Sequence, residues 1–513
     1  MRGLCLFAVV SVSLTLALLP FMVNGAPFLQ DAWDHMHLAL AYAKTGRIVL
    51  KPGGELSSRW FLVNMLIYLL FELAGVPLLQ ASQVAPFLGG LSILPFYLAL
   101  VKLTGHRRLA ALCSLALSLE SLHITLVASV AKVTTSFYPL MCSLLLLHVL
   151  VTKPSARTFS TLALCSLGVL LGHHYMSLSF SVLLLTAALY MLIGWLRGEV
   201  SEVSALGALA ISALFPSCLY VYVRLVGAST AIVGLDDLLL LTSCGILFSV
   251  VLLRRGRPLL WPLVLVAPTV AFLILRGQVY AIYFLATDVR PHEIAGYGLL
   301  ALCFVACGGL VGSSGAGEKL ARAYMASAAT MLLFSFLYGF FYVGIMLLLK
   351  ASYFLGPAAF TWLALAISNS RGRTRHVLLG LLATTMLLIP LPGLRCTVLG
   401  DPGLGGLSSY RRGQYEELRA LAPFISGGHA YGDTTVSYVS MMLEDVDVWA
   451  LHPHVGLKDG SRVVVFKRSW EAGLLEAGYE WFDLRLVVRG RHDRVFDGGH
   501  TLVLVVVGDW GRP

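Results

Sequence analysis

Acidic and histidine side chains are grouped in the segment 30–37, which follows an apolar run. If a helix begins near Asp31, then Asp31, Asp34 and His35 stand at i, i+3 and i+4 and share one face. Carboxylate and imidazole groups at this spacing suit a general base or a divalent-ion site. We therefore predict Asp31 and Asp34 as catalytic residues and His35 and His37 as substrate-binding residues. The structural alternative is that Asp31 caps the helix and Asp34 lies in its first turn, where carboxylates favour the helix dipole.

Other charged and histidine side chains stand in or beside the turns between apolar runs, on the membrane side to which segment 30–37 is assigned below. An anion that carries a lipid tail needs cations at this depth, so we predict further substrate-binding residues at Lys132, His173, His174, Arg290 and Lys350. A divalent cation, Mg²⁺ or Mn²⁺, is predicted as a cofactor held by Asp31, Asp34 and Glu293. Lys350 has an alternative role as an anchor that extends to the membrane surface.

The composition fits a membrane protein. Of 513 residues, 58% are hydrophobic and only 12% are charged, whereas soluble domains average about 25% charged. This excludes a soluble enzyme, a disordered chain and a nucleic-acid module. Residues 1–394 hold 24 Lys and Arg against 12 Asp and Glu, while residues 395–513 hold 13 against 15. The positive excess thus lies in the apolar part, where basic loops set orientation in the membrane.

A membrane-spanning helix needs about 20 mostly apolar residues. Such runs occupy residues 4–23, 60–79, 83–103, 109–128, 135–152, 158–175, 176–196, 203–224, 236–253, 258–275, 296–312, 325–349, 352–368 and 377–394. Glu120 falls near the middle of one run, where pairing with His123 is the structural explanation.

Every second loop after residue 106 is basic, which fixes the direction in which each later run crosses the membrane. With a cytoplasmic N-terminus, one of the earlier apolar runs then cannot cross. We predict that this run is 60–79 and that it lies as a helix in the outer leaflet. We predict thirteen spans with a cytoplasmic N-terminus. The long first external loop is then 24–82. If 4–23 were a cleaved signal peptide, twelve spans would remain.

The tail, 395–513, has a different pattern and is predicted as a small external α+β domain. A helical signal at 414–421 gives way to β-rich runs at 462–466, 484–488 and 501–507, with turn residues at 497–499. The predicted fold class is therefore an all-α polytopic membrane domain, 1–394, followed by this soluble domain.

Two short motifs resemble those of integral-membrane glycosyltransferases of the GT-C superfamily, in particular the catalytic subunit of oligosaccharyltransferase and its archaeal counterparts. Asp31-Ala32-Trp33 and His37 resemble the first-loop motif D-P-W-x-x-x-R, with His in place of Arg. Lys350, Leu355 and Pro357 match the spacing of R-F-x-x-Y-L-x-P, whose Arg contacts donor phosphates. The resemblance implies thirteen spans, a long first external loop, an external C-terminal domain and an external-loop Glu that corresponds to Glu293.

The chain departs from that family at two places. The second acidic motif would fall near 129–136, where this sequence has Lys132 and no acid, so a Lys stands where a metal ion would bring positive charge. The W-W-D-Y-G motif is absent from the tail, and 428–434 is only a weak echo of it, which argues against transfer to Asn acceptors.

Together these features predict a membrane glycosyltransferase acting on the extracytoplasmic side. Its donor is a sugar or glycan on polyprenyl or dolichyl phosphate or diphosphate, its surroundings are membrane lipids, and its acceptor is not specified. The bond from sugar to phosphate is already activated, which agrees with the lack of a nucleotide-binding motif. Two alternatives stay open. One is a transporter or lipid flippase, although no repeated halves are seen. The other is a catalytically inactive GT-C-like accessory subunit.

Overall fold

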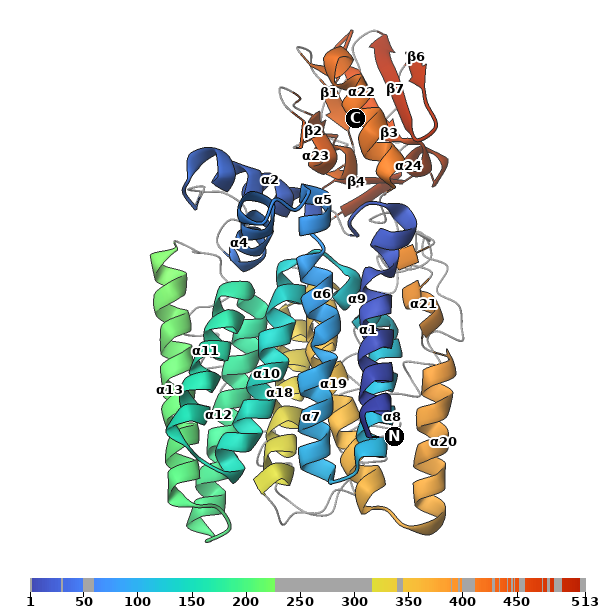
Figure 1. The fold of residues 1–513 in the computed structure, drawn as a ribbon. Helices are drawn as coiled ribbons and strands as arrows, with labels where there is room; N and C mark the ends of the chain where they lie inside the picture. The colour runs from blue at the N-terminus through green and yellow to red at the C-terminus, as the bar shows by residue number, and fades with distance from the viewer. Residues whose placement is uncertain are drawn as a thin grey trace.

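The computed structural model describes part of the chain: residues 2–28, 31–48, 60–226, 316–338, 345–388, 390–394, 397–398, 411–426, 430–432, 434–440, 442–443, 446, 448–451, 457–472, 474–477, 480–483 and 491–507. These residues are mostly helical, and the long helices stand side by side in a bundle with a sheet at one end (Figure 1). Three predicted spans, 236–253, 258–275 and 296–312, lie outside the described residues.

Five helical stretches of the described chain are long and apolar enough to cross a bilayer: Cys5–Asn24, Leu78–Thr104, Lys132–Thr152, His174–Leu196 and Glu202–Leu225. They belong to α1 (Arg2–Asn24), to the consecutive helices α5 (Leu78–Ala81), α6 (Val84–Leu91) and α7 (Ile93–Thr104), and to α10 (Lys132–Thr152), α12 (His174–Leu196) and α13 (Glu202–Leu225). The chain is therefore a membrane protein with a helical apolar domain.

The bundle helices pack through a common apolar core. Helix α10 lies against α11 (Ala156–Gly172), and α18 (Ala316–Tyr338) lies between α12 and α19 (Ile345–Asn369). Large side chains such as Phe137, Phe180 and Phe360 are buried in this core. Two helices begin at serine caps, because the Ser155 and Ser201 hydroxyls accept the backbone N–H of the residue three positions on.

The predicted span 109–128 is interrupted rather than continuous. Helix α8 (Arg107–Leu119) ends before Glu120, which is extended, and α9 (Ser121–Ala128) begins directly after it. The buried Glu120 carboxylate accepts the backbone N–H of His123 at 2.7 Å. The acid therefore acts as the cap of the second helix half, in contact with the His123 backbone.

Lys350 was expected between two spans, 325–349 and 352–368, but it lies inside one helix. Helix α18 ends at Tyr338, and α19 runs through Lys350 without a break. The last predicted run, 377–394, corresponds to α20 (Gly372–Leu388) and the short α21 (Pro390–Leu394). Helix-forming Leu, Met and Ala on both sides of Lys350 explain why no turn forms there.

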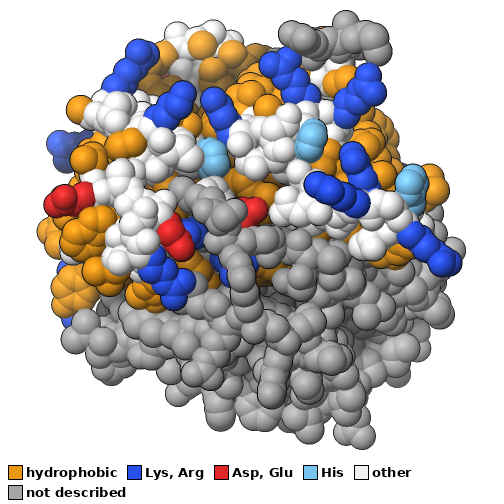
Figure 2. All heavy atoms as spheres, turned by 90° about the horizontal axis from the view of Figure 1, so that it is seen from below, with side chains coloured by type: hydrophobic (Ala, Val, Ile, Leu, Met, Phe, Trp, Pro, Cys, Tyr) orange, Lys and Arg blue, Asp and Glu red, His pale blue; other side chains and the backbone are white. Residues whose placement is uncertain are grey.

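The two ends of the bundle carry different side chains. The turns between α7 and α8, α10 and α11, α12 and α13, and α19 and α20 lie at the end away from the sheet (Figure 1). They contain the exposed residues Arg107, Arg108, Lys153, Arg157, Arg197, Arg371, Arg373 and Arg375. Lys and Arg side chains are spread over this face (Figure 2). We call it the basic end, and the opposite one, which adjoins the strands, the sheet end.

The first predicted loop forms short helices at the sheet end. Helix α2 (Asp31–Thr45) packs against α4 (Leu62–Tyr68), which continues as a π-helical turn, η1 (Leu69–Leu73). The apolar stretch Leu62–Leu73 is too short to cross a bilayer alone. Figure 1 places α2 and α4 between the bundle and the strands. The predicted segment 60–79 is thus a helix at one end of the bundle, beside α2.

The C-terminal part holds a five-stranded sheet in the order β2 (Val448–Ala450), β1 (Ala430–Gly432), β3 (Arg462–Phe466), β7 (Thr501–Val507) and β6 (Arg491–Asp497). Strand β1 is parallel to both neighbours, whereas β7 is antiparallel to β3 and β6. A hairpin of β4 (Leu474–Ala477) and β5 (Glu480–Asp483) stands apart. Strands β3 and β7 lie where the sequence predicts them, and the predicted strand 484–488 lies outside the described residues.

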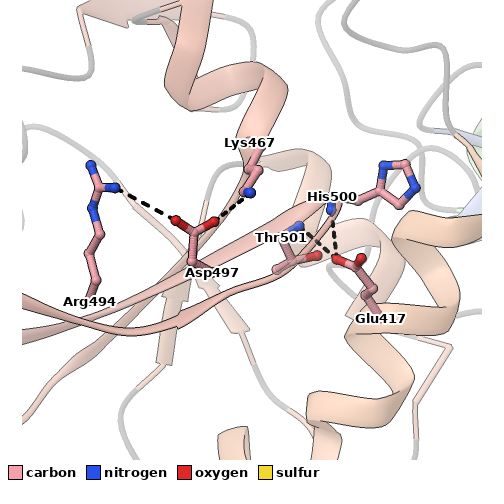
Figure 3. A network of polar contacts seen from close by, with 6 residues as sticks. All are labelled: Glu417, Lys467, Arg494, Asp497, His500 and Thr501. Carbon is pink, nitrogen blue, oxygen red and sulfur yellow. Dashed lines mark hydrogen bonds and ion pairs between the residues drawn. The ribbon is translucent and has the colours of Figure 1, made fainter.

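Helices α22 (Arg412–Ile425), α23 (Thr434–Ser440) and α24 (Lys467–Ala472) accompany the sheet. Glu417 of α22 accepts the backbone N–H groups of His500 and Thr501, both at 2.8 Å (Figure 3). Lys467 and Arg494 both pair with Asp497. These contacts attach a helix to the turn between β6 and β7.

The C-terminal part shares a core with the first loop. Trp33 and Met36 of α2 belong to the same buried cluster as Leu418 of α22 and Val464 of β3. The Trp33 ring also stacks on Tyr415, with centroids 5.5 Å apart. The alternating residues Val463 and Val465 pack on the other face of the sheet. Helix α2 is therefore held from the C-terminal side of the chain.

Candidate active site

Helix α2 carries the predicted acids at its start. Asp31 is its first residue and is half-buried, while Asp34, in the same turn, is buried and 7% exposed. His35 is completely buried. Carboxylates in a first turn favour the helix dipole, as the structural alternative requires. A carboxylate that only caps a helix can remain exposed to solvent, so capping alone does not explain why Asp34 is buried.

A backbone contact ties Lys132 to the start of α2. Phe28 forms an isolated parallel bridge with Ser129, and the Phe28 carbonyl accepts the N–H of Val130 at 3.2 Å. Ala131 is extended, and α10 then begins at Lys132. Because Phe28 stands three residues before Asp31, the bridge fixes the two charged positions relative to each other.

The two histidines at 173 and 174 form the turn between α11 and α12. His173 caps α12, since its Nδ1 accepts the backbone N–H of Tyr175 at 3.1 Å and that of Met176 at 3.4 Å. The rings of His173 and His174 stack with centroids 4.5 Å apart. The acceptor role of Nδ1 places the proton of His173 on Nε2.

Close packing brings this histidine turn to α10. A methyl group on Gly172 would lie 2.5 Å from the Ser136 Cβ and 3.0 Å from its Cα, so the backbones approach as only glycine allows. Ser136 lies in the second turn of α10, one turn beyond Lys132. The turn that carries His173 and His174 thus lies against the helix that Lys132 begins.

Lys350 of α19 joins the same group. The charges of Asp31 and Lys132 both act on the Lys350 ammonium, and Lys350 and Lys132 both act on His174. Lys132 is 9% exposed and Lys350 is half-buried. Four segments that are distant in sequence therefore bring two carboxylates, two ammonium groups and three imidazoles together at the sheet end.

Burial governs the protonation of His35. Loss of water around the ring lowers the pKa of His35 below its ordinary value, the Asp34 carboxylate opposes this change, and Lys132 adds to it. The ring nitrogen Nδ1 lies 2.7 Å from Asn64 Oδ1 on α4. Burial of the ring thus favours the neutral form of the His35 imidazole.

Several buried polar atoms here have no hydrogen-bond partner in the described part of the chain. They are Asp34 Oδ2, His35 Nε2, His174 Nδ1 and Trp60 Nε1. The Trp60 ring lies 4.9 Å from the His174 ring and 6.0 Å from that of Tyr222. Because buried polar atoms are nearly always paired, these four atoms have hydrogen-bonding capacity left for a water molecule or a polar ligand.

Two other predicted residues, Arg290 and Glu293, lie outside the described residues. His37 is half-buried on α2, close in sequence to Asp34 and His35. No cluster of three or more His, Cys, Asp or Glu side chains suited to a metal ion occurs within the described ranges.

Sequence reasoning missed three contributors to the site, Tyr42, Trp60 and Asn64. Asn64 is a polar residue in an otherwise apolar run, and this was the only available signal. Tyr42 and Trp60 gave no signal, because aromatic residues in apolar segments are usually packing residues.

Comparison with known proteins finds remote structural likenesses. No family model and no curated protein matches the sequence. The archaeal oligosaccharyltransferase AglB from Archaeoglobus fulgidus, solved with an inhibitory peptide and a dolichol-phosphate, aligns with 91% of this chain and 70% of its own, at 11% identity and a TM-score of 0.48. ArnT from Cupriavidus metallidurans, bound to undecaprenyl phosphate, aligns with 97% of both chains, at 12% identity and a TM-score of 0.34.

The apo form of ArnT also matches, with a TM-score of 0.35 and 13% identity. At such identities and TM-scores the likeness does not assign an activity to this chain.

Proposed function

We propose that the chain is a membrane glycosyltransferase that moves a sugar or glycan from a polyprenyl-phosphate or diphosphate carrier to an acceptor at the sheet end of the bundle. The observation that supports it best is the group of Asp31, Asp34, Lys132 and Lys350, which are buried or half-buried and have unpaired polar atoms beside them. A carboxylate can take up the proton that the acceptor loses, and ammonium groups stabilise the negative charge of the phosphate that leaves.

In the proposed reaction an acceptor O–H or N–H attacks the sugar carbon that is bonded to the carrier phosphate. The new bond forms from the acceptor atom to that carbon, the carbon–oxygen bond to phosphate breaks, and its electron pair leaves with the phosphate. Asp31 takes the proton of the acceptor. Lys132 and Lys350 stabilise the negative charge that develops on the leaving phosphate.

The distribution of basic residues gives the orientation that we propose. Lys and Arg gather in the turns at the basic end, including Arg107, Lys153 and Arg373. Basic loops favour the cytoplasmic side. The basic end is then cytoplasmic, and the sheet end with Asp31 faces the opposite compartment, where lipid-linked sugars are consumed. A tag after Val507 will be accessible in sealed cells and one at Gly372 will not.

The decisive test is turnover of the full-length protein in lipid nanodiscs with a panel of labelled polyprenyl-phosphate and polyprenyl-diphosphate sugars and a membrane extract as acceptor source. We expect Asp31→Asn to lower the rate by about 10²–10⁴-fold. Glu72→Gln is the matched control, because Glu72 is an exposed acid at the same end. Wild-type rates in Asp31→Asn would refute the assignment of the base, and no turnover with any donor would refute the function.

A divalent ion is a second way to supply the positive charge. Asp31 and Asp34 would be the described ligands of Mg²⁺ or Mn²⁺, with Glu293 as the third. In the described residues two ammonium groups, those of Lys132 and Lys350, act together with Asp31. Turnover that persists in EDTA would assign the positive charge to these lysines, whereas loss in EDTA and recovery with Mg²⁺ or Mn²⁺ would assign it to the metal.

One observation favours transport as a second candidate function. The interruption between α8 and α9 places the buried Glu120 at a break in a helix of the bundle, an arrangement that secondary transporters use at their binding sites. Exchange of a labelled polyprenyl-phosphate sugar between the two leaflets of protein-containing vesicles, unchanged in Asp31→Asn and lost in Glu120→Gln, would support it.

A further inference from the structure

A chain of hydrogen bonds joins α2 to α4 behind the acids. Asn64 Nδ2 donates to the Tyr42 hydroxyl at 3.4 Å, and Asn64 Oδ1 lies 2.7 Å from His35 Nδ1. Both His35 and Asn64 are completely buried, and Tyr42 is 2% exposed. The three side chains are therefore held in one arrangement by packing on every side.

This arrangement decides where the proton of His35 lies. The amide group of Asn64 turns its NH₂ toward Tyr42, so its oxygen faces His35 and accepts a hydrogen bond there. An oxygen that accepts requires a proton on His35 Nδ1. A neutral imidazole carries one proton, which leaves Nε2 with a free lone pair and the ability only to accept.

The second ring nitrogen of His35, Nε2, lacks a hydrogen bond like the one that Nδ1 makes with Asn64. His35 Nε2 is buried and has no hydrogen-bond partner in the described part of the chain. The charged groups that act on the ring are Asp34, Lys132 and Asp31, which are also those of the proposed site. A buried acceptor with a fixed direction and no donor beside it is costly unless a ligand supplies the donor.

We propose that His35 orients the acceptor substrate by accepting a hydrogen bond at Nε2 from an O–H or N–H group of that substrate. This inference rests on the proposed transferase function. Because Nε2 can only accept a hydrogen bond, the substrate group that it contacts must be a donor. The site therefore rejects an analogue in which an ether or ester replaces this O–H or N–H group. His35 orients the acceptor, while Asp31 removes its proton.

The position of the proton is tested without substrate. Solid-state NMR of full-length protein labelled with ¹⁵N-histidine distinguishes the two neutral tautomers, and subtraction of the His35→Asn spectrum isolates the His35 signal among 14 histidines. We expect a proton on Nδ1 in wild type and a change of tautomer in Asn64→Leu. A proton on Nε2 in wild type would overturn the proposal whether or not a donor sugar is known.

The orienting role is tested with the donor and acceptor fractions that give wild-type turnover in the panel above. His35→Asn keeps an amide donor for Asn64 and loses the acceptor at Nε2. We expect about a tenfold rise in KM for the acceptor, with an unchanged KM for the donor. His106→Asn, an exposed histidine at the basic end, is the matched control.

The outcomes separate the two proposals. If His35→Asn raises both KM values equally, the residue has only a structural role and the inference fails while the transferase stands. If no panel member is turned over, the transferase fails, and the NMR result alone decides the tautomer. Methylation of the acceptor hydroxyl that contacts His35, where this is not the attacking group, should abolish the difference between wild type and His35→Asn.

Discussion

The two ends of the helical bundle both contain basic residues and histidines, but in opposite environments. At the basic end, Arg107, Arg373 and His376 are exposed. At the sheet end, Lys132 and His174 are buried. An exposed cation at a helix end contributes little beyond orientation in the membrane, whereas a buried one must be compensated. Burial therefore separates Lys132 and His174 from exposed residues such as Arg107 and His376, whereas the buried Lys319 near the basic end is compensated by an ion pair with Glu199.

Removal of a cation from the candidate site at the sheet end is the strongest test of this contrast. Lys350→Met should lower turnover by about 10²–10³-fold, because a preorganised positive charge near the leaving phosphate is lost. Arg373→Met, which removes an exposed cation at the basic end, should leave turnover unchanged. Initial rates of the reconstituted variants, with thermal unfolding as a check of folding, measure both. Equal effects of the two changes would remove the distinction between the ends.

Two glycines of the bundle, Gly172 and Gly380, differ in how closely other atoms surround them. Gly172→Ala forces a methyl group against Ser136, so we expect a loss of about 1–3 kcal/mol in the free energy of unfolding and displacement of the histidine turn. Gly380→Ala in α20 is the control, since nothing lies within 4 Å of its added methyl group. That change should stabilise the helix by about 0.5–1 kcal/mol. Urea or thermal unfolding distinguishes the two signs.

A smaller effect is expected where the C-terminal part contacts α2. Tyr415→Ala removes the ring that stacks on Trp33, which contributes about 0.5–1.5 kcal/mol beyond the buried area. Turnover should fall because α2 carries Asp31. Tyr415→Phe retains the ring and should behave as wild type. A normal rate in Tyr415→Ala would mean that α2 keeps its position without this contact.

The smallest effect concerns an exposed ion pair away from both ends. Lys467 holds the pKa of Asp497 below its usual value of 3.8, through a hydrogen bond and its charge. The stabilisation is therefore present at neutral pH and is lost as the pH falls through the lowered pKa. Asp497→Asn should lower the unfolding temperature slightly at pH 7 and should not do so in strong acid.

Charge pattern and spacing predicted some of the residues that lie together at the sheet end. Asp31, Lys132 and Lys350 were singled out from sequence, and the structure brings them together. This worked because ionisable residues are rare in apolar sequences and each one stands out. The contact that fixes their distance, between Phe28 and Ser129, had no signal in the sequence, since it uses backbone atoms only.

Two local structures were misread for physical reasons. The break at Glu120 depends on a side chain that accepts a backbone N–H, a role that hydropathy does not record. The helix through Lys350 was read as a turn because a charged residue interrupts the apolar run, although lysine is a good helix former. The role of Asn64 depends on its contacts with Tyr42 and His35 across two helices, which no sequence window contains.

The shared core between α2 and the C-terminal sheet has a consequence for biosynthesis. Chains fold from the N-terminus as they are made, and Trp33 and Met36 leave the ribosome long before the residues that cover them. Until α22 and β3 are made, α2 packs on α4 but lacks the C-terminal part of its cover. A chain that is truncated before these elements would therefore expose the face of α2 that carries Trp33 and Met36.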